Sequence, residues 1–93
     1  MDELRKMIDE FRLRRGYMDF DTVPMLAKSI VIEAAELLEC YQFDEENVDL
    51  ENVKQELADV LIYTLSMAYD LDLDPYEIIK EKIAIVDARH ESK

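Results

Sequence analysis

Two pairs of acidic residues lie inside the two most apolar stretches of this sequence. The members of each pair are three positions apart: Glu33 and Glu36 in the first stretch, and Glu56 and Asp59 in the second. Apart from Glu39, residues 29–40 and 57–69 carry no further charged side chain. Because an α-helix advances about 100° per residue, carboxylates three positions apart share one helix face and lie about 4.5 Å apart along the axis. Each stretch therefore predicts a largely buried helix with two carboxylates on one face.

The lack of basic residues in these stretches restricts what the carboxylates can do. Neither stretch contains a Lys or Arg that can pair with an acid on its own helix. Removing an unpaired carboxylate from water costs several kcal/mol, so a buried acid must protonate, pair with a base from elsewhere or bind a metal. A single Glu-x-x-Glu pair is usually an ordinary solvated feature of a helix. Two such pairs in neighbouring apolar helices favour a metal site.

The four carboxylates match the ligands that Mg²⁺ prefers. Mg²⁺ takes oxygen ligands in octahedral geometry and is usually held by one or two carboxylates together with waters and substrate phosphates. Four acids exceed the need of one such ion, so they favour a pair of ions that clamp a polyphosphate. Zinc is disfavoured because Cys40 is isolated and His90 lies near the C-terminus. Glu39 extends the acidic ladder by one turn and is either a further ligand or a surface residue.

The pattern of apolar residues and caps predicts an all-α subunit of four helices, forming one domain over residues 1–93. A single Gly and two Pro leave few turns, and caps at Thr22, Asp49 and Asp74 mark three helix starts. The expected helices run from Asp2 to about Arg15, from Thr22 or Val23 to about Phe43, from Leu50 to about Asp70, and from Pro75 to about Arg89. The short connection at 44–49 makes the second and third helices antiparallel neighbours, so the two acidic pairs face each other.

Composition and charge indicate what the chain binds. Apolar residues make up 49% of it, and the third expected helix is apolar on nearly all sides, which predicts a homo-oligomer. The net charge of −12 argues against nucleic acid as a partner, although bound cations would still admit a small phosphorylated substrate. No signal peptide and no run of about 18 apolar residues are found, so we expect no membrane association and a cytoplasmic location. The single Cys40 cannot form an internal disulfide.

Four further side chains are candidates for contacts with an anionic substrate. Lys82 and Arg89, on the last expected helix, supply the positive charge that a triphosphate beside four acids requires. Tyr63, one turn after the second acidic pair, is the best placed of the tyrosines to support it. Phe20 belongs to the connector 17–23, which we interpret as a packed loop or as a lid over a site.

The acidic motif as a whole resembles that of a known enzyme family. The pattern Glu33-x-x-Glu36 followed by Glu56-x-x-Asp59, inside "IEAAELLECYQF" and "ELADVLIYTLSMA", resembles the MazG-like nucleotide pyrophosphohydrolases of the all-α NTP pyrophosphatase superfamily. It looks closest to the small, single-domain branch that includes dCTP pyrophosphatases. The resemblance extends from about Phe11 to Arg89, and it implies helical subunits that assemble into dimers or tetramers.

The resemblance also implies an activity and a cofactor. The family hydrolyses (deoxy)nucleoside triphosphates to the monophosphate and pyrophosphate, a reaction suited to cleaning of the nucleotide pool. It implies that Mg²⁺, with Mn²⁺ as a possible substitute, is bound by the four acids, and that a water attacks the α-phosphorus. Members of the branch carry a lysine and an arginine seven apart that contact phosphates, and Lys82 and Arg89 match that spacing.

The chain departs from the family pattern where the nucleotide is recognised. The branch often has Phe-His-x-Pro-Lys-Asn before the second helix, whereas this chain reads Phe20-Asp21-Thr22-Val23-Pro24-Met25. Near the C-terminus the branch commonly has an Asn four positions after the lysine that matches Lys82, and this chain has Val86 there. The resemblance thus predicts the reaction better than the base, and broad or unusual specificity, including modified nucleotides, is one hypothesis. The alternatives are a phosphoribosyl-ATP pyrophosphohydrolase-like enzyme and a non-catalytic helical interaction module.

Overall fold

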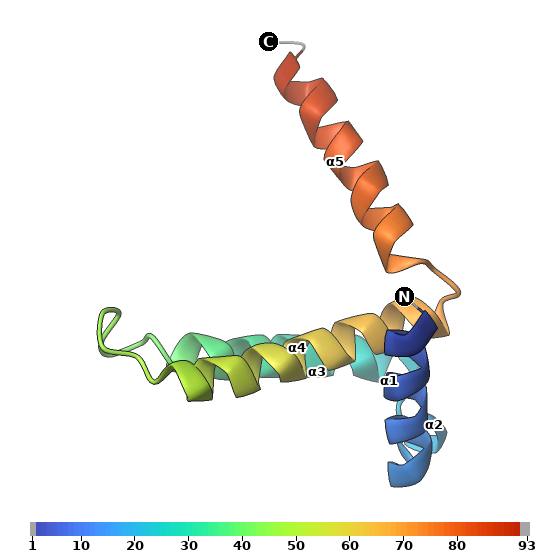
Figure 1. Ribbon diagram of the computed structural model, residues 1–93, viewed down its shortest axis with the longest axis horizontal. Helices are drawn as coiled ribbons and strands as arrows, with labels where there is room; N and C mark the ends of the chain where they lie inside the picture. Colours follow the sequence, from blue (N-terminus) through green and yellow to red (C-terminus); the bar gives the residue numbers. More distant parts are fainter. Residues whose placement is uncertain (1, 92–93) are drawn as a thin grey trace.

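The computed structural model describes residues 2–91 and shows five helices in this part of the chain (Figure 1). They are α1 (Asp2–Arg15), α2 (Tyr17–Phe20), α3 (Val23–Glu39), α4 (Leu50–Asp70) and α5 (Pro75–Glu91). The same residues contain no strand, which confirms the all-α class. None of these helices combines the length and the hydropathy that a membrane span requires.

Helices α3 and α4 form an antiparallel hairpin, which is the most extensive contact between helices in the described chain (Figure 1). Both helices begin at the predicted caps. The Thr22 hydroxyl accepts a hydrogen bond from the Met25 N–H at 3.4 Å. The Asp49 carboxylate accepts from the N–H groups of Glu51 at 3.0 Å and Asn52 at 3.4 Å. These caps satisfy N–H groups that lack partners within the helix, so they help to fix where each helix begins along the hairpin.

Helix α1 lies across the end of the hairpin at which α4 finishes (Figure 1). The guanidinium of Arg12 donates hydrogen bonds to both carboxylate oxygens of Asp70, at 3.0 and 2.8 Å. The Arg12 side chain is only 3% exposed and that of Asp70 is 23% exposed. The hydrogen bond with Asp70 raises the pKa of Arg12 further. Because bidentate, charge-assisted pairs of this kind hold a fixed geometry, this pair ties α1 to the last residue of α4.

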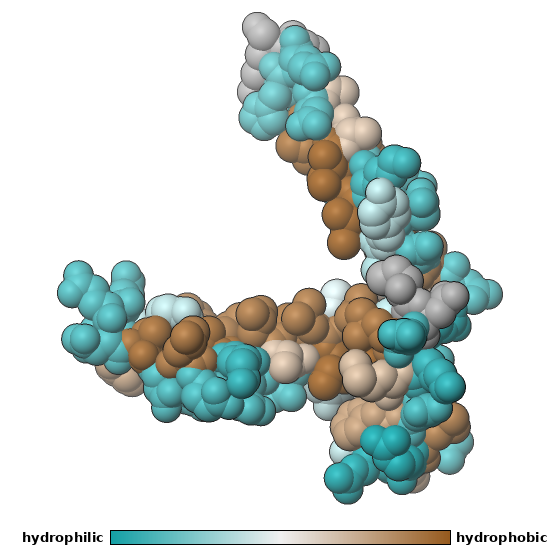
Figure 2. Space-filling model, viewed as in Figure 1, coloured by the Kyte–Doolittle hydropathy of each residue, from teal (hydrophilic) through white to brown (hydrophobic). Residues whose placement is uncertain are grey.

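Helix α5 projects away from the hairpin and touches no described helix except α4 (Figure 1). The chain turns through Asp72, which has a φ of 59°, and the Asp74 carboxylate accepts a hydrogen bond from the Tyr76 N–H at 2.9 Å. The large apolar side chains of α5 that remain exposed are Tyr76, Ile78, Ile79, Ile83 and Ile85. Figure 2 shows hydrophobic residues along the side of α5 that faces the hairpin, and further hydrophobic surface along the hairpin itself. We call the exposed apolar side chains of α5 the α5 stripe.

The prediction of four helices is corrected to five, because a single helical turn, α2, occupies the connector expected to be a loop or lid. Gly16 adopts a φ of 71°, a left-handed conformation that costs glycine little and that ends α1. The next helical turn, α2, begins directly after Gly16, and the Asp21 N–H donates a hydrogen bond to the Tyr17 carbonyl at 2.8 Å.

The hairpin loop is longer than predicted, because α3 ends at Glu39 and not near Phe43. The Asp44 carboxylate accepts hydrogen bonds from the N–H groups of Glu46 at 3.0 Å and Asn47 at 3.1 Å. Such local bonds from an aspartate side chain compete with helical hydrogen bonding and favour a turn. The side-chain amide of Asn47 also donates to Asp44, at 3.1 Å, and this bond together with the backbone bonds holds the pKa of Asp44 below its usual value.

Candidate metal centre and adjoining cavities

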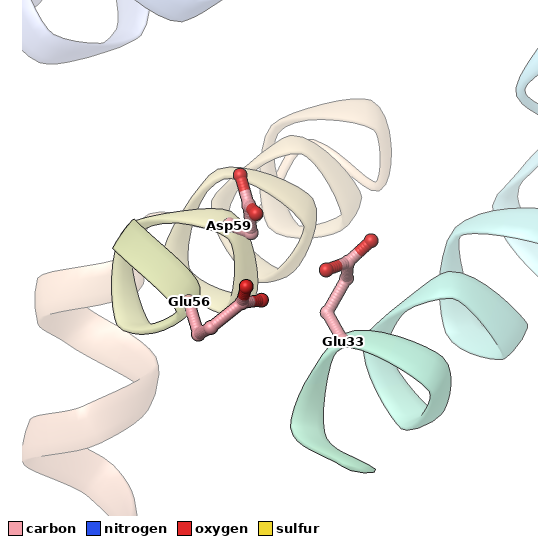
Figure 3. Close-up of side chains that lie close together, drawn as sticks. All are labelled: Glu33, Glu56 and Asp59. Atoms are coloured by element: carbon pink, nitrogen blue, oxygen red, sulfur yellow. The ribbon is translucent and has the colours of Figure 1, made fainter. Parts of the chain in front are cut away.

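The hairpin brings acids from its two helices together near its middle (Figure 3). Glu33 extends from α3, and Glu56 and Asp59 extend from α4. One carboxylate oxygen from each of the three lies within 4.8 Å of the others. We call these three residues the acidic triad. The antiparallel pairing predicted from the short connection therefore makes members of both acidic pairs converge.

The carboxylates of the acidic triad repel one another, and their burial adds to the cost of ionising them. Burial raises the pKa of Glu33 to about 7, and the neighbouring Glu36, Asp59 and Glu56 act in the same direction. Burial also raises the pKa of Glu56, again with help from the charges of Glu36 and Asp59. One carboxylate oxygen each of Glu33 and Glu56 is buried without a hydrogen-bond partner. Like charges held this close disfavour full ionisation, so the site favours either a proton or a cation.

The donor set suits a hard divalent cation. It consists of carboxylate oxygens, which Mg²⁺ and Mn²⁺ prefer over the nitrogen and sulfur ligands typical of zinc. A buried carboxylate oxygen without a hydrogen bond is costly, and a bound cation removes that cost. Glu33, Glu56 and Asp59 are thus the residues that would hold a metal.

Glu36 and Glu39 lie beside the triad and not within it. Glu36 is exposed and does not belong to the group of oxygens within 4.8 Å, although its carboxyl perturbs both Glu33 and Glu56. It lines a polar cavity of about 630 Å³ together with Glu39, Glu56 and Asn52. We call this the polar cavity. The four predicted ligands therefore share one region, with Glu36 on the side that opens toward the hairpin loop.

A second, smaller cavity of about 170 Å³ adjoins the triad on its other side. Glu33 and Asp59 contribute to its wall, and most of the remaining wall is aromatic or aliphatic, from Phe11, Tyr17, Leu26, Ile62 and Tyr63. We call this the aromatic cavity. The Phe11 and Tyr17 rings meet edge to face, with centroids 5.7 Å apart. Burial, followed by the charge of Glu33, raises the pKa of Tyr63. Tyr63 thus lies where the sequence placed it, beside the acids.

Three further polar residues line the aromatic cavity: Arg12, Asp21 and Ser66. The sequence allows two interpretations of the basic cluster that ends the first helix: it complements the helix dipole, or Arg12 or Arg15 reaches an anionic ligand. The structure places Arg12 in the cavity wall, on the apolar face that it shares with the buried Ile8. Ser66 follows Tyr63 by three positions on α4. Asp21 belongs to the connector 17–23 and to the segment in which the chain departs from the family pattern of nucleotide recognition. The sequence thus indicated its neighbourhood, but not that its side chain lines a cavity.

The other predicted substrate-binding residues are not brought to the acids within one chain. Phe20 is 74% exposed and lines neither cavity. Lys82 and Arg89 lie on α5, which leaves the hairpin near the end of α4 (Figure 1). Their assignment as phosphate-binding residues stays a prediction, and it requires α5 to meet an acidic site other than its own.

Comparisons with known proteins found a matching family and a similar solved structure. The model of the MazG-like family matches residues 28–91, which include both acidic pairs. A crystal structure of a pyrophosphatase from Archaeoglobus fulgidus is similar to this chain, with 37% sequence identity and a TM-score of 0.84. The similarity covers 96% of this chain and 90% of the archaeal one. None of the curated proteins matches the chain significantly.

Proposed function

Because this chain belongs to the MazG-like family, we propose that it is a metal-dependent pyrophosphohydrolase that converts a nucleoside triphosphate to the monophosphate and pyrophosphate. The observation that carries the proposal is the acidic triad, in which carboxylates from α3 and α4 converge and Glu33 and Glu56 each have a buried oxygen without a hydrogen bond. A protein site that binds and activates phosphates through divalent cations needs a cluster of oxygen ligands of this kind. A role in cleaning the nucleotide pool and a cytoplasmic location belong to the same proposal.

The residues of the site have separable roles in this reaction. Glu33, Glu56 and Asp59 would hold the cation, with Glu36 as a further ligand beside them. A divalent cation, preferentially Mg²⁺, supplies neutralisation of the phosphate charge when it is bound. A carboxylate oxygen that is not used for this purpose can accept a hydrogen bond from the attacking water and orient it toward the α-phosphorus. The candidates for that second role are the same four acids and Glu39.

We propose further that the working form is a homo-oligomer. The supporting observation is the α5 stripe, because several isoleucine side chains exposed on one helix are unusual for a stable monomer. Among the described residues that line the two cavities, Arg12 is the one basic residue, and its guanidinium is engaged by Asp70. A second copy that covers the α5 stripe would also carry its Lys82 and Arg89 toward an acidic site. That arrangement supplies the positive charge that a triphosphate requires.

Pyrophosphate release tests the activity directly. The assay covers the common deoxy- and ribonucleoside triphosphates and phosphoribosyl-ATP, each with Mg²⁺ and with Mn²⁺. We expect pyrophosphate and the monophosphate from at least one nucleoside triphosphate, and strong loss of activity in Glu36→Gln. Glu45→Gln, in the exposed hairpin loop, is the matched control and should behave as wild type. Absence of activity on every triphosphate, or an unaffected Glu36→Gln, would contradict the proposal. Turnover of phosphoribosyl-ATP alone would identify the protein as a phosphoribosyl-ATP pyrophosphohydrolase-like enzyme.

A further inference from the structure

We infer that Asp21 is a specificity-determining residue, which makes this enzyme prefer nucleotides whose base carries an amino group over those with a carbonyl oxygen in its place. The preferred bases are therefore cytosine and adenine, and the disfavoured ones are uracil and hypoxanthine. This inference rests on the proposed function, because it concerns the base of the nucleotide whose phosphates the triad binds.

The two cavities on either side of the triad differ in a way that orients the nucleotide. The aromatic cavity presents the edge-to-face pair of Phe11 and Tyr17, together with Tyr63. The polar cavity presents Glu36, Glu39 and Glu56 and is the more open of the two. Stacking on aromatic side chains stabilises a nucleobase, whereas a cluster of acids suits cations and the phosphates that they carry. The base therefore enters the aromatic cavity, and the phosphates lie over the triad.

Asp21 supplies a hydrogen-bond acceptor in that cavity. It follows α2, is held there by the bond from its own N–H to the Tyr17 carbonyl at 2.8 Å, and its side chain is half-buried in the cavity wall. Its negative charge acts on both Arg12 and Tyr63, which line the same space. The carboxylate has no hydrogen bond or ion pair with any residue in the range 2–91. Arg12, which lines the same cavity, directs its terminal nitrogens to Asp70.

An ionised carboxylate accepts hydrogen bonds and cannot donate them. The amino groups of cytosine and adenine are donors and so complement it, whereas uracil presents a carbonyl oxygen at the same position. The imide N–H of uracil is flanked by two carbonyl oxygens, and the carboxylate repels both. Other polar side chains also line this cavity. Glu33 and Asp59 belong to the acidic triad, and Arg12 directs its terminal nitrogens to Asp70. Ser66 is a hydroxyl that can donate or accept, so it does not discriminate between these bases. The discrimination thus falls to Asp21.

The test compares two matched pairs of substrates, dCTP with dUTP and dATP with dITP. Within each pair an amino group is replaced by a carbonyl oxygen, and the neighbouring ring nitrogen gains a proton. For the wild-type protein we expect kcat/KM to favour the amino member of each pair by about ten-fold. Asp21→Asn should bring both ratios close to one, because the amide can donate to the carbonyl oxygen. Asp19→Asn, an exposed position on α2 outside the cavity wall, should leave both ratios unchanged. Equal ratios in the wild type and in Asp21→Asn, or a wild-type preference for the oxo bases, would overturn the inference.

A binding measurement separates this inference from the proposed activity. Thermal melts with dCMP or dUMP report recognition of the base whether or not a triphosphate is hydrolysed. A larger midpoint shift with dCMP, lost in Asp21→Asn and kept in Asp19→Asn, supports the role of Asp21 even if no pyrophosphate is released. Equal shifts with the two monophosphates, in a protein that does release pyrophosphate, contradict the inference and leave the proposed function in place.

Discussion

The α3–α4 hairpin and α5 depart from the usual distribution of residues in opposite ways. The hairpin holds carboxylates close together in a half-buried position, with one oxygen each of Glu33 and Glu56 left without a hydrogen bond. Helix α5 exposes isoleucines, with Ile79 at 57% and Ile83 at 55%. A charge without a partner and an apolar surface without cover are both unfavourable in water. The chemistry of each region fits the component that we propose for it, a cation for the hairpin and a second copy of the chain for α5.

The difference also shows which part of the chain is complete by itself. Both helices of the hairpin begin at caps with satisfied hydrogen bonds, and α1 braces the hairpin through Arg12 and Asp70. Contacts within the chain therefore position its acids. Helix α5 makes few contacts with the rest of the chain, and its direction depends on the turn at Asp72. Burying an isoleucine side chain contributes about 1.5–3 kcal/mol, so covering the α5 stripe provides a substantial driving force for assembly.

The largest effect is expected from removing one charge of the acidic triad. Glu56→Gln keeps the size of the side chain but weakens the cation site, and we expect kcat/KM for pyrophosphate release to fall by about 100-fold or more. Glu51→Gln, an exposed acid in the first turn of the same helix, is the control and should retain activity. Near-normal turnover by Glu56→Gln would show that the triad is not the metal site.

The next largest effect is expected from placing a charge in the α5 stripe. Ile83→Asp should dissociate the homo-oligomer at micromolar concentration, because an aspartate cannot be buried in an apolar interface without a large cost. Light scattering measures the assembly, and we expect pyrophosphate release to fall about ten-fold with it. Glu81→Gln, on the same helix and already exposed, should change neither. A wild-type protein that is monomeric and fully active would contradict the proposal that the α5 stripe is an assembly surface.

A smaller effect is expected from adding the cation to the folded protein. A ligand that binds only the native state stabilises it by about 2.7 kcal/mol at 100 times its Kd, so millimolar Mg²⁺ should raise the melting midpoint by several degrees. Glu33→Gln should reduce this shift, whereas Ile83→Asp should keep most of it, because the hairpin is intact. Equal shifts in Glu33→Gln and in the wild type would place the cation elsewhere.

The smallest effect concerns the pH dependence of stability without metal. The folded protein holds the pKa of Glu33 at about 7, above its ordinary value of 4.5, so between these values the native state binds the proton more tightly than the unfolded state does. Stability from this group is present below about pH 4.5 and is lost as the pH rises through 7. The melting midpoint of the metal-free protein should therefore decline over this window, and Glu33→Gln should flatten the decline. If the midpoints of the wild type and of Glu33→Gln both rose across this window, and at the same rate, this assignment would be contradicted.

The local features of the sequence predicted much of this structure. The all-α class, the bounds of α4, the caps at Thr22 and Asp49 and the convergence of Glu33 with Glu56 and Asp59 all follow from helical periodicity and side-chain chemistry. The family resemblance was confirmed by the comparisons. These features depend on residues a few positions apart or on one short connection, which is why sequence patterns report them.

The features that the sequence did not predict depend on contacts between distant segments or on competition between local structures. Gly16 ends α1 with a positive φ, and the separate turn of α2 follows it. The Asp44 side chain accepts hydrogen bonds from backbone N–H groups and so favours a turn after α3 over a longer helix. The partnership of Arg12 with Asp70 joins residues 58 positions apart, and no local pattern encodes it. The cavity that contains Asp21 is likewise formed only when α1 and α2 meet the hairpin.

The bond between Arg12 and Asp70 joins two parts of the molecule that otherwise have separate tasks. Arg12 lines the aromatic cavity, and Asp70 is the last residue of α4, two positions before the turn at Asp72 that sends α5 outward. The bond therefore couples the position of α1, which forms part of the cavity wall, to the end of α4 from which α5 departs.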